Sequence, residues 1–256
     1  MMRTLTFKRG AIYAVLMLST ALSTGCATGP NANPKDPLEP MNRSISTFND
    51  ALDDNVLKPV ATGYRDYTPG LVQTGVNNFF RNLSDVLSTV NNGLQLKGHD
   101  TAESFMRVTV NTIFGIYGIF DVATPIGLER HPEDFGQTLG YWGVPEGPYL
   151  VLPLFGPSTV RDTSALPLDF ALDPVTNHDV SSERTTATVV RIVDKRASLL
   201  KTTNLLSGAA IDKYSFTRDG YLQFRRNQVF DGNPPDDEQL EDPSAAPAAA
   251  TSPSAK

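Results

Sequence analysis

EDFGQTLGYWGVPEGPYLVLPLFGPSTVRD, residues 133–162, combines many turn-forming residues with many apolar ones and holds the only tryptophan, Trp142. Its turn-forming residues include Gly140, Gly143, Gly147, Gly156, Pro145, Pro148, Pro153 and Pro157. Such a distribution excludes a long regular helix or a central strand. We interpret the stretch as an irregular apolar surface that meets lipid or a lipid-like ligand. A tightly packed loop of a soluble domain is the alternative.

Individual roles inside this stretch follow from residue type. Five apolar or aromatic residues are expected to line a lipid passage: Tyr141, Trp142, Tyr149, Leu150 and Leu152. Ser158 and Thr159 precede Val160 and predict the N-cap of a following helix.

A second apolar stretch, VTVNTIFGIYGIF at residues 108–120, has no formal charge. It is too short to cross a bilayer, which needs about 20 residues, and too apolar on every side for a surface helix. A helical hairpin lying in one membrane leaflet fits, and so does a buried core helix. For the first possibility the membrane-embedded residues are Ile113, Phe114, Ile116, Tyr117, Ile119 and Phe120.

The amino terminus is typical of a secretory signal. Arg3, Lys8 and Arg9 precede the apolar residues 11–22, and small residues lead to Cys26, the only cysteine. This arrangement resembles a bacterial lipobox, with residues 1–25 as the signal peptide and an acylated Cys26 as the anchor. An ordinary signal peptide that leaves a free thiol is the alternative. Residues 26–37 are polar and aperiodic, and we expect a lipidated tether.

Charge excludes some partners. The chain has a net charge of −6; removing the signal takes three of its 22 basic residues and none of its 28 acidic ones, which leaves −9. Such a balance disfavours nucleic acid. It also argues against simple electrostatic docking on anionic lipid, so insertion is the expected way of holding a membrane.

Apolar periodicity predicts helices on both sides of these stretches. One spans 41–56 and is closed by Pro59; a second begins at Thr68-Pro69, and Ser84 caps a third over 87–94. The asparagines at 77, 78, 82, 91 and 92 either line a polar path or are simply solvated or capping. Asp100 is expected to cap the next segment.

Three more helices are expected towards the carboxyl terminus. A short one covers 166–172, and an amphipathic one begins at Ser181 or Ser182. Its basic side carries Arg191 and Lys195, which either contact phosphate headgroups or belong to an ordinary solvent-exposed face of the helix. The last helix covers about 215–230, and the acidic, then Pro/Ala/Ser-rich residues 231–256 are expected to be disordered.

No catalytic or metal-binding motif stands out. The chain has three histidines: His99 is expected in a loop, His178 in a polar turn, and His131 lies beside Glu133 and Asp134. No second histidine-bearing cluster completes a metal site, so we expect neither a metal nor a cofactor. The chain lacks a G-x-S-x-G elbow, a P-loop and a G-x-G-x-x-G motif, and we expect no enzymatic activity.

Two stretches resemble the signatures of the MlaA (VacJ) family of outer-membrane lipoproteins. They are residues 133–162 and residues 36–69, DPLEPMNRSISTFNDALDDNVLKPVATGYRDYTP. The resemblance covers about residues 36–230 and implies a mainly α, ring-like helical domain over 38–230, partly embedded in one leaflet. It also implies that the protein passes phospholipid from the outer membrane to a soluble periplasmic carrier, MlaC, and so maintains lipid asymmetry. A trimeric porin of the OmpC/OmpF type is the implied scaffold.

The expected function is therefore non-enzymatic transfer of phospholipid by a lipid-anchored protein at the inner leaflet of the outer membrane. A structural envelope lipoprotein that tethers other outer-membrane proteins is the main alternative, because apolar surfaces also form protein interfaces. A membrane phospholipase with an unrecognised site is a third possibility.

Overall fold

The computed structural model describes residues 33–209 and 211–235, and no side chain is described for residues 204–209. Predictions about the signal peptide, the acylation of Cys26, most of the tether and residues 236–256 lie outside this part of the chain. The helices are α2 (Glu39–Leu52), α3 (Lys58–Tyr67), α4 (Gly70–Leu94), α5 (Gly98–Ile113), α6 (Phe135–Tyr141), α7 (Val160–Leu172), α8 (Ser181–Ala209) and α9 (Lys213–Val229). The fold is mainly α, as predicted.

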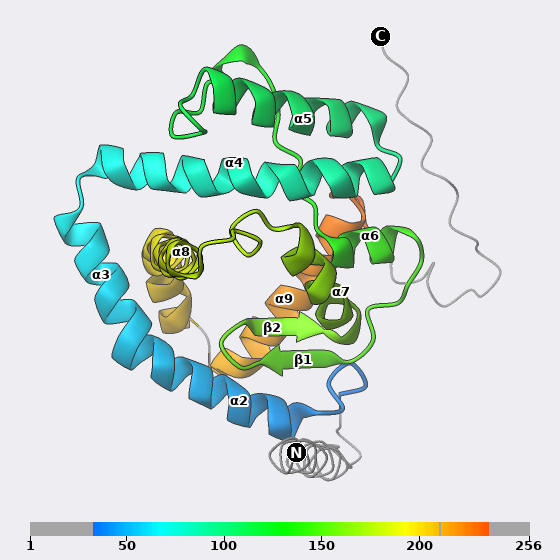
Figure 1. The fold of residues 1–256 in the computed structure, drawn as a ribbon. Coiled ribbons are helices and arrows are strands. Elements are labelled where there is room, and N and C mark those ends of the chain that lie inside the picture. Colours follow the sequence, from blue (N-terminus) through cyan, green and yellow to red (C-terminus); the bar gives the residue numbers. More distant parts are fainter. Residues whose placement is uncertain (1–32, 210, 236–256) are drawn as a thin grey trace, which may run out of the picture.

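The helices form a ring (Figure 1). Helices α2, α3 and α4 follow one another along an arc, and α5 packs along the outer side of α4. Helix α8 lies inside the arc against α3 and α4. The ring is completed by α6, α7, α9 and an antiparallel hairpin of β1 (Tyr149–Leu152) and β2 (Gly156–Thr159), in which Tyr149 pairs with Thr159.

A π-helical turn, η1 (Asp53–Leu57), joins α2 directly to α3. The prediction that Pro59 closes the helix is therefore wrong. The Lys58 N–H donates to the Asp53 carbonyl five residues earlier, and this wider turn makes room for the proline ring. Pro59 then occupies the first turn of α3, where a missing N–H is tolerated.

Helix α4 is a single helix where the sequence predicted two. Ser84, the expected cap of the second, donates its hydroxyl to the Phe80 carbonyl within the continuous helix. Thr68 does not cap α4 either, because it ends α3 by donating its N–H to Tyr64. Serine and threonine favour caps in general, but packing along the whole length of α5 overrides that preference here.

Apolar burial is limited and divided. One small core contains Tyr149, Val151, Tyr214 and Leu222, and another contains Ala61, Ala197 and Leu200. Among the described residues, buried polar side chains outnumber buried apolar ones. Within the same part of the chain no helix is both long and apolar enough to cross a membrane.

Candidate lipid-contacting site

Residues 113–120, here called the apolar lobe, follow the end of α5. Its six predicted membrane-embedded side chains are 41–72% exposed, so the buried-core-helix alternative is wrong. The chain turns back sharply rather than forming a second helical leg. Ile116 and Tyr117 take positive φ angles of 51° and 56°, and the Gly118 N–H donates to the Asn111 carbonyl. A compact apolar turn therefore projects from the ring.

Polar contacts hold the base of the apolar lobe. The Asn111 side-chain oxygen accepts the N–H groups of Val122 and Ala123 at 2.8 and 2.9 Å. Gly118 has no room for a side chain, because a Cβ there would lie 2.6 Å from the Asn82 side chain. The lobe is thus exposed and apolar at its tip but fixed by hydrogen bonds where it leaves the ring.

A groove of about 1020 Å³ lies beside the apolar lobe, between the first half of α4 and the beginning of α8. Asp121 and Glu183 are its only charged lining residues. The others are Leu71, Val72, Thr74, Gly75, Val76, Asn78, Phe79, Phe80, Ile119, Phe120, Ser182, Thr186, Ala187 and Val190. A volume of this size with an apolar lining suits an acyl chain.

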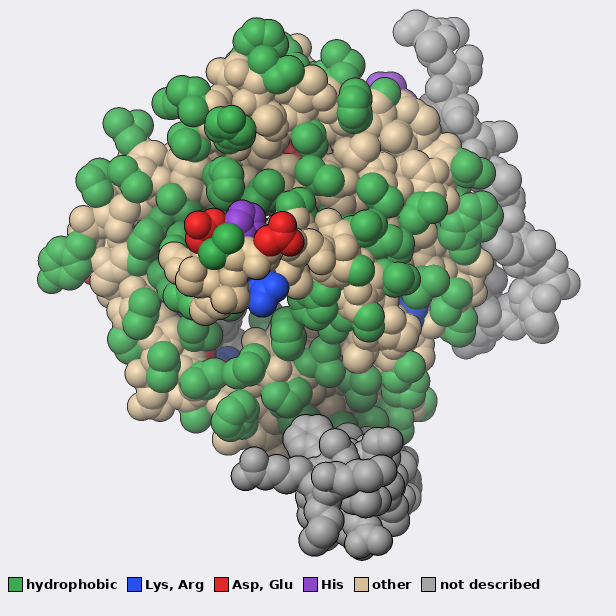
Figure 2. Space-filling view, viewed as in Figure 1, with side chains coloured by type: hydrophobic (Ala, Val, Ile, Leu, Met, Phe, Trp, Pro, Cys, Tyr) green, Lys and Arg blue, Asp and Glu red, His purple; other side chains and the backbone are tan. Residues whose placement is uncertain are grey.

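One face of the ring carries many hydrophobic side chains and few charged ones (Figure 2). Hydrophobic side chains spread over the outer helices, while the few charged side chains gather near the centre, over the loop that leads into α8 and beside a hollow. Exposed apolar side chains come from several elements of the chain; they include Tyr67, Leu71, Phe105, Phe114, Tyr117, Trp142, Leu154 and Phe155. A surface of this kind is typical of contact with lipid or with another apolar partner.

The five residues predicted to line a passage do not lie together. Tyr141 and Trp142 are exposed at the end of α6, with ring centroids 5.6 Å apart. Tyr149 is buried, with 1% exposure, in the core against α9, whereas Leu150 and Leu152 are half-buried on the other face of β1. Residues 133–162 are thus an exposed apolar surface at the end of α6 and a packed segment at Tyr149. A passage through these side chains stays a prediction.

Residues 133–162 also hold much of an ionic clamp formed by Asp134, Asp162 and Arg225. Arg225 donates to Asp134 at 2.5 and 2.7 Å and to Asp162 at 2.9 Å, and so joins α6, α7 and α9. Asp134 caps α6 by accepting the Gln137 N–H. The Tyr221 hydroxyl adds a hydrogen bond to Asp162.

Burial and pairing act in opposite directions on the clamp. Burial alone would lower the pKa of Arg225 and raise that of Asp162, but their hydrogen bonds and charges shift both pKa values towards the ionised pair. Nearby, burial raises the pKa of Asp169 to about 6. Gly136 admits the guanidinium, because a Cβ there would lie 2.4 Å from Arg225 Nη2.

The amino end of α7 matches its prediction. The Thr159 hydroxyl accepts the Asp162 N–H, so Thr159 is the N-cap. The clamp itself was missed. Asp134 is a typical N-cap residue and carried a detectable signal, but its partner Arg225 lies 91 positions away.

The predicted headgroup residues lie on α8, which begins at Ser181 as expected. Arg191 pairs with Asp173 at 2.8 Å and approaches the Ser84 hydroxyl, whereas Lys195 is exposed. Arg191 therefore has a protein carboxylate as its present partner. Their contact with headgroups stays a prediction.

Three of the asparagines of α4 fasten it to neighbouring parts of the chain: Asn82 bonds to Thr112 of α5, Asn91 to α6, and Asn92 to the segment before α6. Asn82, Asn91 and Asn92 are buried, so the solvated interpretation is wrong for them. Asn92 donates to the His131 carbonyl, and Asn91 accepts from the Thr138 hydroxyl. This buried row is a packing interface between helices.

The structure brings together two histidines that the sequence separates. His99 lies in the first turn of α5 rather than in a loop, and its ring centroid is 6.2 Å from that of His131. Asp100 is not the cap of α5; it lies in the same turn, with its carboxylate between the two rings.

Comparisons with known proteins agree with this geometry. A family model described as MlaA lipoprotein matches residues 34–228. The intermembrane phospholipid transport system lipoprotein MlaA of Shigella flexneri is 36% identical over 82% of this chain and 85% of its own length. An uncharacterized protein of Rickettsia bellii is 36% identical over 76% of each chain. A solved structure, described as a structural basis for maintenance of bacterial outer membrane lipid asymmetry, superposes with a TM-score of 0.67. It is 36% identical and covers 77% of this chain and 99% of its own.

Proposed function

This chain belongs to the MlaA lipoprotein family, and from that membership we propose how it transports phospholipid. It is an outer-membrane lipoprotein of the intermembrane phospholipid transport system that binds phospholipid and passes it on, thereby maintaining lipid asymmetry of the outer membrane. We propose that the ring lies in one leaflet, with the apolar lobe among the acyl chains.

The apolar lobe carries this proposal. If this side of the ring faced only water, four apolar or aromatic side chains of the lobe would stay in contact with it, because each is more than half exposed. They are Ile113, Phe114, Ile116 and Tyr117. Burying one such side chain in hydrocarbon is worth about 1.5–3 kcal/mol. Their combined contribution is large enough to hold one side of the ring in a leaflet without any membrane-spanning helix.

The groove beside the lobe explains how a single lipid is taken up. An acyl chain enters between α4, the lobe and α8, where it meets an almost uncharged lining. The headgroup stays on the side of the ring where charged side chains gather, near the loop before α8 (Figure 2). Neither half of the lipid then has to be transferred into an environment of the wrong polarity.

The remaining features of the proposal come from the family. Cys26 carries the lipid anchor after removal of residues 1–25, the protein faces the periplasm, and a soluble carrier of the MlaC type receives the lipid. A trimeric porin of the OmpC/OmpF type serves as scaffold. The protein acts by binding and guiding lipid rather than by hydrolysing it, because lipid transfer requires no covalent step.

A transfer assay tests this function. The full-length protein is placed in liposomes that contain a labelled phospholipid, a soluble lipid-binding protein is added as acceptor, and its lipid is identified by thin-layer chromatography. We expect intact phospholipid on the acceptor only when the protein is present. Lyso-lipid or free fatty acid would instead identify an enzyme, and no transfer to a competent acceptor would favour the tethering role.

A further inference from the structure

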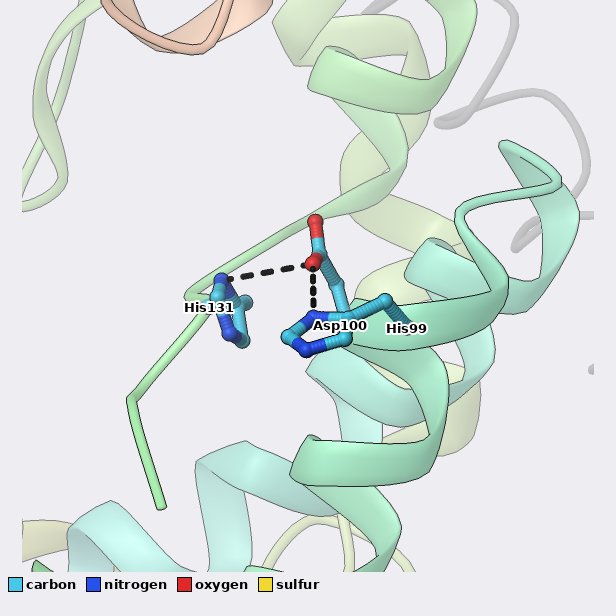
Figure 3. A group of neighbouring side chains, drawn as sticks. All are labelled: His99, Asp100 and His131. Carbon is cyan, nitrogen blue, oxygen red and sulfur yellow. Dashed lines mark hydrogen bonds and ion pairs between the residues drawn. The ribbon is translucent and has the colours of Figure 1, made fainter. Parts of the chain in front are cut away.

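His99, Asp100 and His131 form a cluster at the opposite end of α5 from the apolar lobe. The first turn of α5 supplies His99 and Asp100, and the segment that leads into α6 supplies His131 (Figure 3). Both rings turn towards the Asp100 carboxylate. One nitrogen from each ring and one carboxylate oxygen lie within 4.8 Å of one another.

We propose that this cluster binds a divalent first-row metal ion of the zinc class. Two imidazole nitrogens and a carboxylate oxygen are a common ligand set for Zn²⁺, with water in the fourth position. The site is independent of the proposed lipid transport. No lipid-contacting residue takes part in it.

The distances fit a tetrahedral ion. Ligands that lie 2.0–2.1 Å from such an ion are about 3.3–3.4 Å apart. Asp100 Oδ1 is 3.2 Å from His99 Nδ1 and 3.8 Å from His131 Nδ1. His99 is 80% exposed, so its ring is free to make the remaining adjustment.

Glu103 holds the second ring nitrogen of His131 and also lies 3.8 Å from His99 Nδ1. Its Oε2 lies 2.6 Å from His131 Nε2, the ring nitrogen that does not face Asp100. A hydrogen bond from Nε2–H to this carboxylate leaves Nδ1 unprotonated and directed at the ion. Carboxylates that hold the second nitrogen of a ligating histidine are a general feature of zinc sites.

The charge balance also favours a cation. Asp100 and Glu103 place two carboxylates in the first turns of α5 and offset the partial positive charge of that helix terminus. Lys97, the neighbouring cation, is paired instead with Glu133 and Asp231 at 3.0 and 2.6 Å.

A bound ion would tie the start of α5 to the segment before α6. The chain between these two points contains the rest of α5 and the whole apolar lobe. Closing this loop with a metal restricts the unfolded chain and stabilises the fold.

Titration with Co²⁺ tests the site. The full-length protein in detergent is stripped with a chelator, and Co²⁺ is added while the visible absorption is followed. We expect one Co²⁺ per chain with the intense bands of tetrahedral coordination, displaced by Zn²⁺. His99→Ala and His131→Ala should each weaken binding by about 100-fold, and Glu103→Gln by about 10-fold. His178→Ala, which changes the remaining histidine, is the matched control and should bind like the wild type.

Thermal unfolding gives a second measurement that does not depend on absorption. Added Zn²⁺ should raise the unfolding midpoint of the wild type and of His178→Ala, but not that of His131→Ala. Equal Co²⁺ binding by all variants would mean adventitious binding. Absence of binding by the wild type would mean that the cluster holds ion pairs only. Either outcome would overturn the proposal.

Discussion

The ionic clamp and the apolar lobe distribute polarity in opposite ways. The clamp buries charges: the Arg225 and Asp162 side chains are each 8% exposed. The lobe exposes apolar groups, with Phe114 at 71% and Tyr117 at 72%. A water-soluble protein favours the reverse arrangement. The difference indicates that polar contacts help to hold the ring together while its apolar side chains stay exposed, as the proposed contact with lipid requires.

The largest expected effect comes from breaking the clamp. Arg225→Met removes the cation that pairs with the buried Asp162 and the partly exposed Asp134, and we expect the free energy of unfolding to fall by about 3–5 kcal/mol. Chemical denaturation followed by circular dichroism measures this change. Arg65→Met, which breaks an exposed pair with Asp66, should unfold like the wild type. Equal losses for the two variants would contradict the role of the clamp.

Charging the apolar lobe should affect membrane binding and leave stability intact. Ile116→Asp places a charge among acyl chains, and we expect binding to liposomes in a flotation assay to fall at least about 10-fold. Its fold should survive, because Ile116 is 58% exposed and aspartate tolerates the positive φ.

Leu96→Asp is the matched control for that variant. Leu96 is 77% exposed, has a φ of 60°, and lies between α4 and α5 beside Lys97 and His99. We expect it to bind liposomes like the wild type. The same loss from both variants would show that the lobe has no special place in the leaflet.

A pair of glycines tests how closely the clamp is packed. Gly136→Ala forces a Cβ against Arg225 and Asp162, and we expect a loss of about 2 kcal/mol in the free energy of unfolding. Gly63→Ala in α3 meets no atom within 4 Å and should stabilise the protein by about 0.5–1 kcal/mol. Thermal unfolding of both variants checks the opposite signs. Two losses of similar size would argue against close packing at Gly136.

Asp169, beside the clamp, gives a smaller expected effect than Gly136 and a defined pH dependence. Because the pKa of Asp169 is raised to about 6, its ionisation destabilises the folded protein, and the stability that it contributes falls as the pH rises from about 4 to about 6. Asp169→Asn keeps the acceptor for the Phe135 N–H and should stabilise the protein by about 1 kcal/mol at pH 7.

Denaturation of the wild type and Asp169→Asn at several pH values checks this dependence. The difference between the two proteins should disappear by about pH 4. A difference in stability that stays constant over this pH range would contradict a raised pKa of the Asp169 carboxyl group.

How much could be predicted from sequence differs between the two regions. An uncharged segment too short to span a membrane indicated the lobe but left a buried core helix as an alternative, whereas the Thr159 cap follows from local residue type. The clamp depends on Asp134 and Arg225, which lie 91 positions apart, and no local pattern links them. The same limit hid the proximity of His99 and His131. Proline and serine signals failed at Pro59 and Ser84 because a π-helical turn and extended packing outweighed local propensity.

The most direct test of the account is the position of the apolar lobe in a bilayer. Tyr117→Trp in a Trp142→Phe background gives a protein whose only tryptophan is in the lobe. In liposomes, lipids brominated along the acyl chain should quench its fluorescence strongly, and aqueous iodide should quench it weakly. Strong quenching by iodide with no effect of the brominated chains would contradict a lobe embedded in hydrocarbon.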